Sequence, residues 1–164
     1  MLRRLWLNLF GGWFRGTRWF PDDTMARIRD AIAAGERTHA GEICFAVESR
    51  FAPWAIFSGL TARERAGQLF GALGVWDTQD NSGVLLYLQL AERCVEIVAD
   101  RGIAARVPPE RWEALCIRFA DEVHRGSAQA AVLACIAGIH ELLAEHFPAG
   151  DDNPRELSDE PRRL

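Results

Sequence analysis

Residues 74–103 constrain the fold of this chain more than any other stretch of its sequence. A polar loop at 77–82 leads into the apolar run 84–90, and a second apolar run at 94–99 follows a short polar break at Glu92-Arg93. Two apolar runs separated by so short a break predict an antiparallel hairpin. This hairpin defines the centre of a sheet and brings acidic side chains to one end of it.

Helix and strand signals elsewhere in the chain extend the hairpin into an α/β fold. The run 42–47 is apolar throughout, which is typical of a central strand buried on both faces. Thr61 and Glu64 have the spacing of a capping box, and a helix with one apolar face follows them. Glycine and proline residues mark the ends of the other helices. We expect helices over 22–35 and 62–73, a third after Pro109, and a buried core helix over about 128–147.

The order of these elements predicts a mixed sheet. A helix connects the strand at 42–47 to the strand at 84–90, and such crossovers join parallel neighbours. The strand at 94–99 is antiparallel to the second strand, because a tight hairpin joins them. The first two strands therefore begin at the end of the sheet where the third strand finishes.

Acidic and amide side chains gather at that end of the sheet. Carboxylate and amide oxygens that converge on one spot suit a hard cation such as Ca²⁺ or Mg²⁺. The same residues leave an alternative open, because Asp and Asn followed by Gly83 also form a good turn without a metal. The predicted metal ligands are Asp77, Asp80, Asn81, Asp100 and Glu42.

Composition and missing motifs exclude several classes of function. The net charge of −4 argues against a nucleic-acid-binding domain, which normally has a basic face. No GxGxxG or GKS/T motif occurs, so nucleotide binding is not expected, and no GxSxG or HExxH motif occurs either. An enzyme built on this chain would use water activated by a metal or by carboxylates. The four cysteines form no CxxC pair and fit buried thiols in a reducing compartment.

The two ends of the chain differ from its centre. The segment 1–19 is aromatic and carries four arginines and no acid. Its apolar run is short and no small-residue cleavage site follows, so it does not match a signal peptide. It is either a strap that covers the domain or a peripheral contact with an anionic membrane surface. Residues 20–148 form the α/β domain, and the acidic tail 149–164 is expected to be disordered.

Five groups of motifs along the chain occur in a characteristic order. They are His39-Ala40-Gly41-Glu42-Ile43 with Phe45-Ala46-Val47-Glu48, Gly74-Val75-Trp76-Asp77, Asn81-Ser82-Gly83-Val84-Leu85-Leu86, Arg93 with Glu96-Ile97, and Asp100-Arg101-Gly102-Ile103. Together these motifs resemble the TPM domain family over roughly residues 20–147, and short bacterial members most of all. The resemblance implies a three-layer α/β/α sandwich, which agrees with the mixed central sheet and with the element order helix-strand-helix-strand-strand-helix-helix expected from the chain itself.

The resemblance also carries functional implications. The family includes a thylakoid-lumen protein described as an acid phosphatase and linked to photosystem II repair. The resemblance implies a divalent-cation site, often for calcium, near the loop that matches 77–81, and it implies phosphatase activity less directly. Better-known members are usually secreted and often have a membrane helix after the domain. Neither feature is evident here, so we expect a cytoplasmic protein that contacts a membrane, if at all, through residues 1–19.

Two functional hypotheses follow. The first is a divalent-cation-binding interaction module that serves a membrane-linked complex or a repair process, with an unknown protein partner on Trp54, Phe57 or the N-terminal aromatic residues.

The second hypothesis is a metal-assisted acid phosphatase, a phosphomonoesterase. Asp77, Asp80 and Asp100 would hold the metal and Arg101 would bind the phosphate, which makes Asp77 and Arg101 the candidate catalytic residues. A single arginine among several acids makes a poor phosphate cradle, because the acids repel a dianion. This charge argument favours the first hypothesis.

Overall fold

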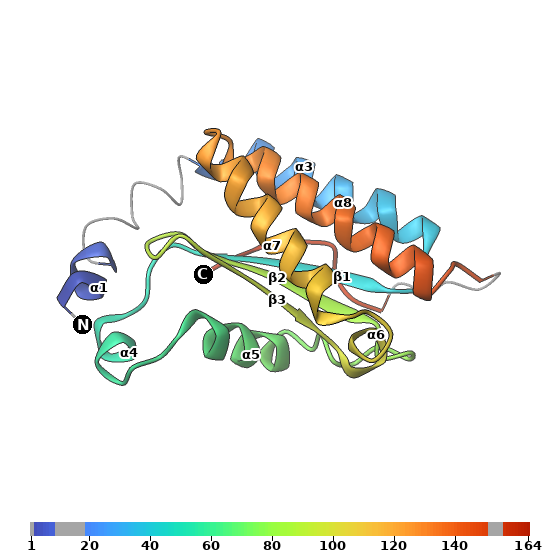
Figure 1. Ribbon diagram of the computed structural model, residues 1–164, viewed down its shortest axis with the longest axis horizontal. Coiled ribbons are helices and arrows are strands. Elements are labelled where there is room, and N and C mark those ends of the chain that lie inside the picture. Colours follow the sequence, from blue (N-terminus) through green and yellow to red (C-terminus); the bar gives the residue numbers. More distant parts are fainter. Residues whose placement is uncertain (1, 9–18, 151–155) are drawn as a thin grey trace.

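A four-stranded mixed sheet separates two layers of helices in the part of the chain that the structure describes (Figure 1). The computed structural model describes residues 2–8, 19–150 and 156–164. The strand order is β3-β2-β1-β4. The strands are β1 (Glu42–Glu48), β2 (Gly83–Gln89), β3 (Cys94–Ala99) and β4 (Arg162–Arg163).

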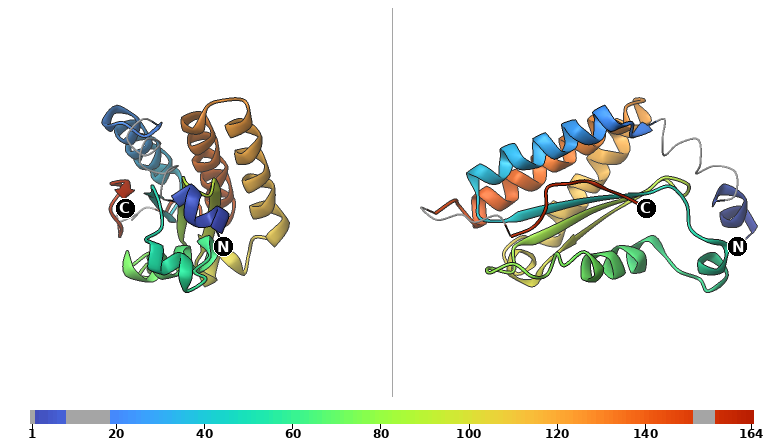
Figure 2. Two further views of the ribbon diagram at one scale, coloured as in Figure 1. Left: turned by 90° about the vertical axis from the view of Figure 1, so that its left-hand side faces the viewer. Right: turned by 180° about the vertical axis from the view of Figure 1, so that it is seen from behind.

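The helices form layers on both faces of this sheet. Helices α3 (Asp22–Gly35), α7 (Pro109–His124) and α8 (Ala128–His146) cover one face, and α5 (Ala62–Ala72) covers the other (Figures 1 and 2). The expected three-layer α/β/α sandwich with a mixed sheet is therefore confirmed. Shorter helical segments lie between these elements: α1 (Leu2–Trp6), η2 (Glu36–Thr38), α4 (Pro53–Phe57) and α6 (Arg101–Ala104).

The register of the sheet follows the expected topology. Strands β1 and β2 are parallel, with Glu42 opposite Gly83, and α5 lies in the crossover between them. Strands β2 and β3 are antiparallel, and the turn between them spans residues 90–93 rather than Glu92-Arg93 alone. Arg93 closes this turn with a φ of 54°, in the left-handed region that non-glycine residues rarely adopt.

Both faces of the two central strands are buried, which explains their uninterrupted apolar sequences. Along β1, Ile43, Phe45 and Val47 belong to the core formed with α3 and α8, while Cys44 and Ala46 belong to the core under α5. Adjacent residues of a strand point to opposite faces, so a strand covered on both sides has no solvent-facing position. Each fully buried aliphatic or aromatic side chain of this kind stabilises the fold by about 1.5–3 kcal/mol.

Helix α8 is the buried core helix that its sequence predicts. Its length and composition would also allow a membrane span, but it packs between neighbours in the helical layer. Gly138 brings α7 close to it, because a Cβ at this position would lie 2.4 Å from Cδ2 of Leu115.

The C-terminal tail differs from its expected disorder over residues 156–164. Strand β4 pairs in parallel with the edge of β1, and the Leu164 N–H donates to the Val47 carbonyl at 2.9 Å. An Nη1–H of Arg163 donates to Asp22 at 2.7 Å and so ties the tail to α3. The tail is ordered here because β1 would otherwise leave its edge N–H and C=O groups without partners. Residues 151–155 of the predicted tail lie outside the described residues.

Candidate functional site

The acidic residues predicted from the sequence lie at the end of the sheet where β1 and β2 begin. Glu42 is the first residue of β1 and pairs with Gly83, while Val84 pairs with Ala99 at the end of β3. The Asp100 N–H donates to the Gly83 carbonyl at 2.9 Å, so the exit of β3 meets the entry of β2. The loop before β2 and the start of α6 therefore adjoin each other.

The loop before β2 packs closely against α6. The Asn81 carbonyl accepts from the N–H groups of Gly102 and Ile103, at 3.0 and 3.2 Å. A Cβ at Gly102 would lie 2.3 Å from the Asp80 carbonyl oxygen, so only glycine fits at this contact. Asn81 has a φ of 52°, which asparagine tolerates better than most residues.

The predicted ligands on this loop differ in exposure and bonding. Asp77 and Asp80 are exposed, and Asn81 is half-buried. The Asn81 side-chain Oδ1 accepts from Nε of Arg101 at 2.7 Å, so that oxygen already has a strong donor. Arg101, the predicted phosphate-binding residue, is exposed and holds this asparagine.

Asp100 has one carboxylate oxygen with a partner and one without. It is buried, and its Oδ1 caps the start of α6 by accepting from the Arg101 N–H at 2.7 Å. Its Oδ2 is also buried, and no hydrogen-bond donor reaches it among the described residues. A buried carboxylate oxygen without a donor is rare in folded proteins, because its desolvation is unfavourable. Oδ2 is therefore the oxygen of Asp100 that its neighbours leave without a donor.

Three carboxyl groups lie close together at the start of β1. One oxygen each from Glu36, Glu42 and Asp159 lies within 4.8 Å of the others. Glu36 and Glu42 are buried, and Asp159 is half-buried. Glu36 comes from η2 and Glu42 from the start of β1, six residues later, whereas Asp159 comes from the distant C-terminal tail.

The tail links this carboxyl cluster to the loop before β2. The Glu42 carboxylate accepts from the backbone N–H groups of Glu156 and Leu157, at 3.1 and 3.3 Å. The Glu156 carboxylate in turn accepts from the Gln79 N–H at 2.9 Å. Glu42 therefore belongs both to the predicted ligand set and to the cluster that the structure brings together.

Burial changes the ionisation of the clustered acids. The pKa of Glu36 is raised to about 8, mainly by desolvation and also by the nearby Glu42 and Asp159 carboxylates. The Ile43 N–H, which donates to Oε1 at 2.9 Å, opposes this rise. Desolvation also raises the pKa of Glu42. At neutral pH the cluster therefore holds a proton on Glu36, and a cation would compete with that proton.

Sequence reasoning missed Glu36 and Asp159 as candidate ligands. Glu36 directly follows Gly35 at the end of α3, where an acid is usually solvated. Asp159 belongs to a stretch whose composition indicates disorder. The signal that could have found Glu36 is its position six residues before Glu42, with His39 between them.

His39 lies in the same part of the chain, between Glu36 and Glu42. It is fully buried, and its Nε2 lies 2.7 Å from Nδ1 of His140 on α8. Its Nδ1 accepts from the Gly41 N–H, so Nε2 carries the proton and donates it to His140. Nε2 of His140 then donates to the Ala31 carbonyl at 3.2 Å. Desolvation, followed by the neighbouring His140, lowers the pKa of His39 to about 4, so both rings are neutral at pH 7.

Comparison with known proteins agrees with this fold. The sequence model of the TPM domain matches residues 16–142, and the chain therefore belongs to the TPM domain family. The NMR structure of BA42 protein from the psychrophilic bacterium Bizionia argentinensis superposes with a TM-score of 0.74 and 24% sequence identity. The alignment covers 87% of this chain and 93% of that protein, which shows a shared fold. No curated protein sequence matches this chain.

Proposed function

We propose that this TPM-domain protein is a divalent-cation-binding interaction module that takes Ca²⁺ or Mg²⁺ at the acidic end of its sheet. The observation that carries this proposal is the spacing of the Glu36, Glu42 and Asp159 carboxylate oxygens, which lie within 4.8 Å of one another. Oxygen ligands lie roughly 2.3–2.6 Å from calcium, so two of them on opposite sides of one ion are about 5 Å apart. The spacing therefore fits a shared hard cation.

The charge balance of the cluster supports the same proposal. Burying several carboxylates together is unfavourable unless protons or a cation neutralise them. Raised pKa values at Glu36 and Glu42 indicate that protons do so without metal. A divalent cation would displace a proton and restore the ionised form, which hard cations prefer.

The loop residues remain predicted ligands at the same end of the sheet. Asp100 supports this prediction most strongly, because its buried Oδ2 has no donor among the described residues. Asp77 and Asp80 are exposed, and binding an ion there would need no burial of charge. Asn81 supports it least, since an ion would have to replace Arg101 at its Oδ1.

The alternative function is a metal-assisted acid phosphatase, with Asp77 and Arg101 as candidate catalytic residues. Phosphate sites usually combine basic side chains with backbone N–H groups that point at the anion. Here the Gln79 N–H donates to Glu156, and the Gly102 N–H donates to the Asn81 carbonyl. These donors are therefore already engaged, and we rank the phosphatase second.

The setting we propose is a cytoplasmic protein with an unknown protein partner. The four cysteines are unpaired thiols, which supports a reducing compartment. Desolvation raises the pKa of each of these thiols, so they are protonated and unreactive at neutral pH.

The test of the cation site is an amide NMR titration of the full chain, first with calcium and then with magnesium. We expect shifts at Glu42, in the loop 77–82, at 100–102 and in the tail 156–159. Glu42→Gln should weaken binding, whereas Glu48→Gln at the opposite end of β1 should leave it unchanged. An absence of shifts at millimolar metal would overturn the proposal.

The same samples separate the two functions. Turnover of p-nitrophenyl phosphate that requires the metal and is lost in Asp77→Asn would favour the phosphatase. Metal binding without turnover would favour the module.

A further inference from the structure

Large apolar side chains are exposed together at the end of the molecule opposite the acidic cluster. Seven large apolar residues among the described residues are exposed, and four of them belong to α1 and α4. The two helices contact each other at the end of the molecule where the hairpin turn and the N-terminus lie (Figures 1 and 2). The four residues, which we call the aromatic platform, are Leu2 (81% exposed), Trp6 (66%), Trp54 (73%) and Phe57 (59%).

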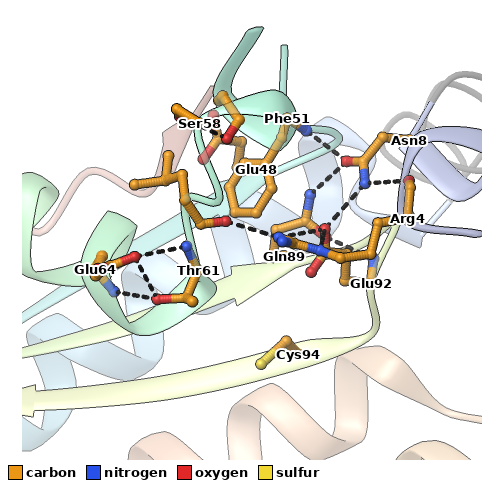
Figure 3. A network of polar contacts seen from close by, with 12 residues as sticks. Arg4, Asn8, Glu48, Phe51, Ser58, Thr61, Glu64, Gln89, Glu92 and Cys94 are labelled. Atoms are coloured by element: carbon orange, nitrogen blue, oxygen red, sulfur yellow. Dashed lines mark hydrogen bonds and ion pairs between the residues drawn. The ribbon is translucent and has the colours of Figure 1, made fainter. Parts of the chain in front are cut away.

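A polar network holds α1 against the sheet, so the platform has a defined geometry (Figure 3). The Arg4 guanidinium donates to the Glu92 carboxylate at 2.9 Å and to the Leu60 carbonyl at 2.7 Å. Glu92 belongs to the turn of the hairpin, and Leu60 follows α4. One arginine therefore connects α1 to both elements that flank it.

Asn8 supplies the buried part of this network. Its side chain is 1% exposed, and its Oδ1 accepts from the Phe51 N–H at 2.6 Å and from the Gln89 amide at 3.2 Å. Its Nδ2 donates to Glu92 at 3.1 Å (Figure 3). A buried amide with donors and acceptors satisfied fixes one arrangement, because losing any partner would leave a buried polar group unpaired. Leu2 and Trp6 are therefore held in place beside α4 while remaining exposed.

Basic residues accompany the aromatic platform. Residues 2–8 contain Arg3 and Arg4 and no acidic residue. Arg3 is exposed on α1, between Leu2 and the arginine that holds α1 in place. Glu92, which contacts α1, pairs with Arg4 at 2.9 Å and offsets its charge. The platform thus combines protruding aromatic rings with the exposed positive charge of Arg3.

We propose that the aromatic platform docks this protein on the surface of an anionic lipid bilayer. Tryptophan and phenylalanine rings enter the interface between headgroups and acyl chains, and arginines bind the anionic headgroups. Protruding side chains from two short helices suit a flat, deformable surface, whereas a protein partner would need pockets to receive each ring. The proposal is independent of the cation site, which lies at the other end of the sheet.

Vesicle co-sedimentation of the full chain tests this proposal. Vesicles contain phosphatidylcholine and phosphatidylglycerol in equal amounts, with phosphatidylcholine alone as the neutral comparison. We expect binding to the anionic vesicles that weakens with added salt. The double variant Trp54→Ser with Phe57→Ser should bind at least about tenfold more weakly. Arg3→Gln should bind more weakly and with a smaller dependence on salt.

Trp76→Ser is the matched control, because Trp76 is 55% exposed but precedes the acidic loop. It should bind vesicles like the unchanged protein, and thermal melts should show that every variant is folded. Failure of the full chain to bind anionic vesicles would overturn the proposal and would indicate that the aromatic platform binds a protein instead. Equal losses in Trp76→Ser and in the platform variant would overturn it as well.

Discussion

Replacing Glu36 by glutamine tests whether the carboxyl cluster is destabilising when ionised. Glutamine has the same shape, and its carbonyl oxygen can still accept from the Ile43 N–H, which donates to Oε1 at 2.9 Å. Its amide can also donate to Asp159, whose hydrogen bond and charge act on Glu36 in the folded protein. The substitution therefore removes the charge and keeps the packing.

The magnitude follows from the raised pKa of Glu36. An acid whose pKa is raised on folding contributes its full stability below its unfolded value, and that contribution is lost as the pH rises towards the folded value. For Glu36 this window extends from 4.5 to about 8. At about 1.4 kcal/mol for each pH unit, ionised Glu36 lowers the free energy of unfolding by up to about 5 kcal/mol at pH 9. Glu36→Gln should be more stable by a similar amount at that pH in the presence of a chelator.

Urea unfolding at pH 5, 7 and 9 measures this effect, with and without calcium. Calcium should stabilise the unchanged protein, by about 2.7 kcal/mol at a hundredfold excess over its dissociation constant, and should stabilise Glu36→Gln less. Glu141→Gln, at an exposed site on α8, serves as the control and should change nothing. If Glu36→Gln is less stable than the unchanged protein at pH 9 in chelator, the reasoning about the buried cluster is refuted.

Three further predictions address the fold and the site. Gly83→Ala should lower the free energy of unfolding by about 3 kcal/mol in urea, because its Cβ would lie 2.0 Å from the Val75 carbonyl oxygen. Gly67→Ala on α5 is the control: its Cβ would have nothing within 4 Å, and it should raise the free energy of unfolding by about 0.5–1 kcal/mol. Because the pKa of His39 is lowered on folding, the folded protein loses stability as the pH falls from 6.5 to about 4. His39→Asn should therefore lose less stability than the unchanged protein between pH 7 and pH 5 in urea unfolding. Equal losses in the two proteins would contradict this prediction. A variant that ends at Gly150 lacks Asp159 and the two backbone N–H groups that donate to Glu42. Its calcium affinity, measured by titration calorimetry, should be weaker by roughly tenfold or more. An unchanged affinity would show that the tail does not contribute to the cation site.

Local signals in the sequence predicted most of the fold. The capping box at Thr61 forms both of its bonds with Glu64, and α5 begins where the box places it. The continuous apolar runs became the strands β1 and β2, because a sheet covered by helices on both faces buries every side chain of its central strands. The crossover rule then supplied the parallel pairing, which depends on chain connection rather than on any particular residue.

The parts that sequence reasoning missed depend on tertiary contacts. Strand β4 consists of two exposed arginines and has no apolar alternation, so its pairing with β1 depends on the open edge of the sheet rather than on its own composition. The buried pair His39 and His140 depends on Gly35, because a Cβ there would lie 2.2 Å from Nε2 of His140. The carboxyl cluster likewise joins segments that are more than a hundred residues apart, and periodicity in one segment carries no information about the other.

Strand β1 contains its own comparison for the proposed cation site, because it has a glutamate at each end. Glu42 and Glu48 are six residues apart and therefore point to the same face of the sheet, and both are buried. Glu48 accepts two bonds from Arg65, at 2.9 and 3.2 Å, and one from the Tyr87 hydroxyl at 2.6 Å, which neutralises its charge within the fold. Glu42 instead faces other carboxylates and receives two backbone N–H groups. At one end of the strand the glutamate is neutralised by the guanidinium of Arg65, and at the other end the glutamate lies among acids. We therefore expect a divalent metal ion to bind at Glu42 and not at Glu48.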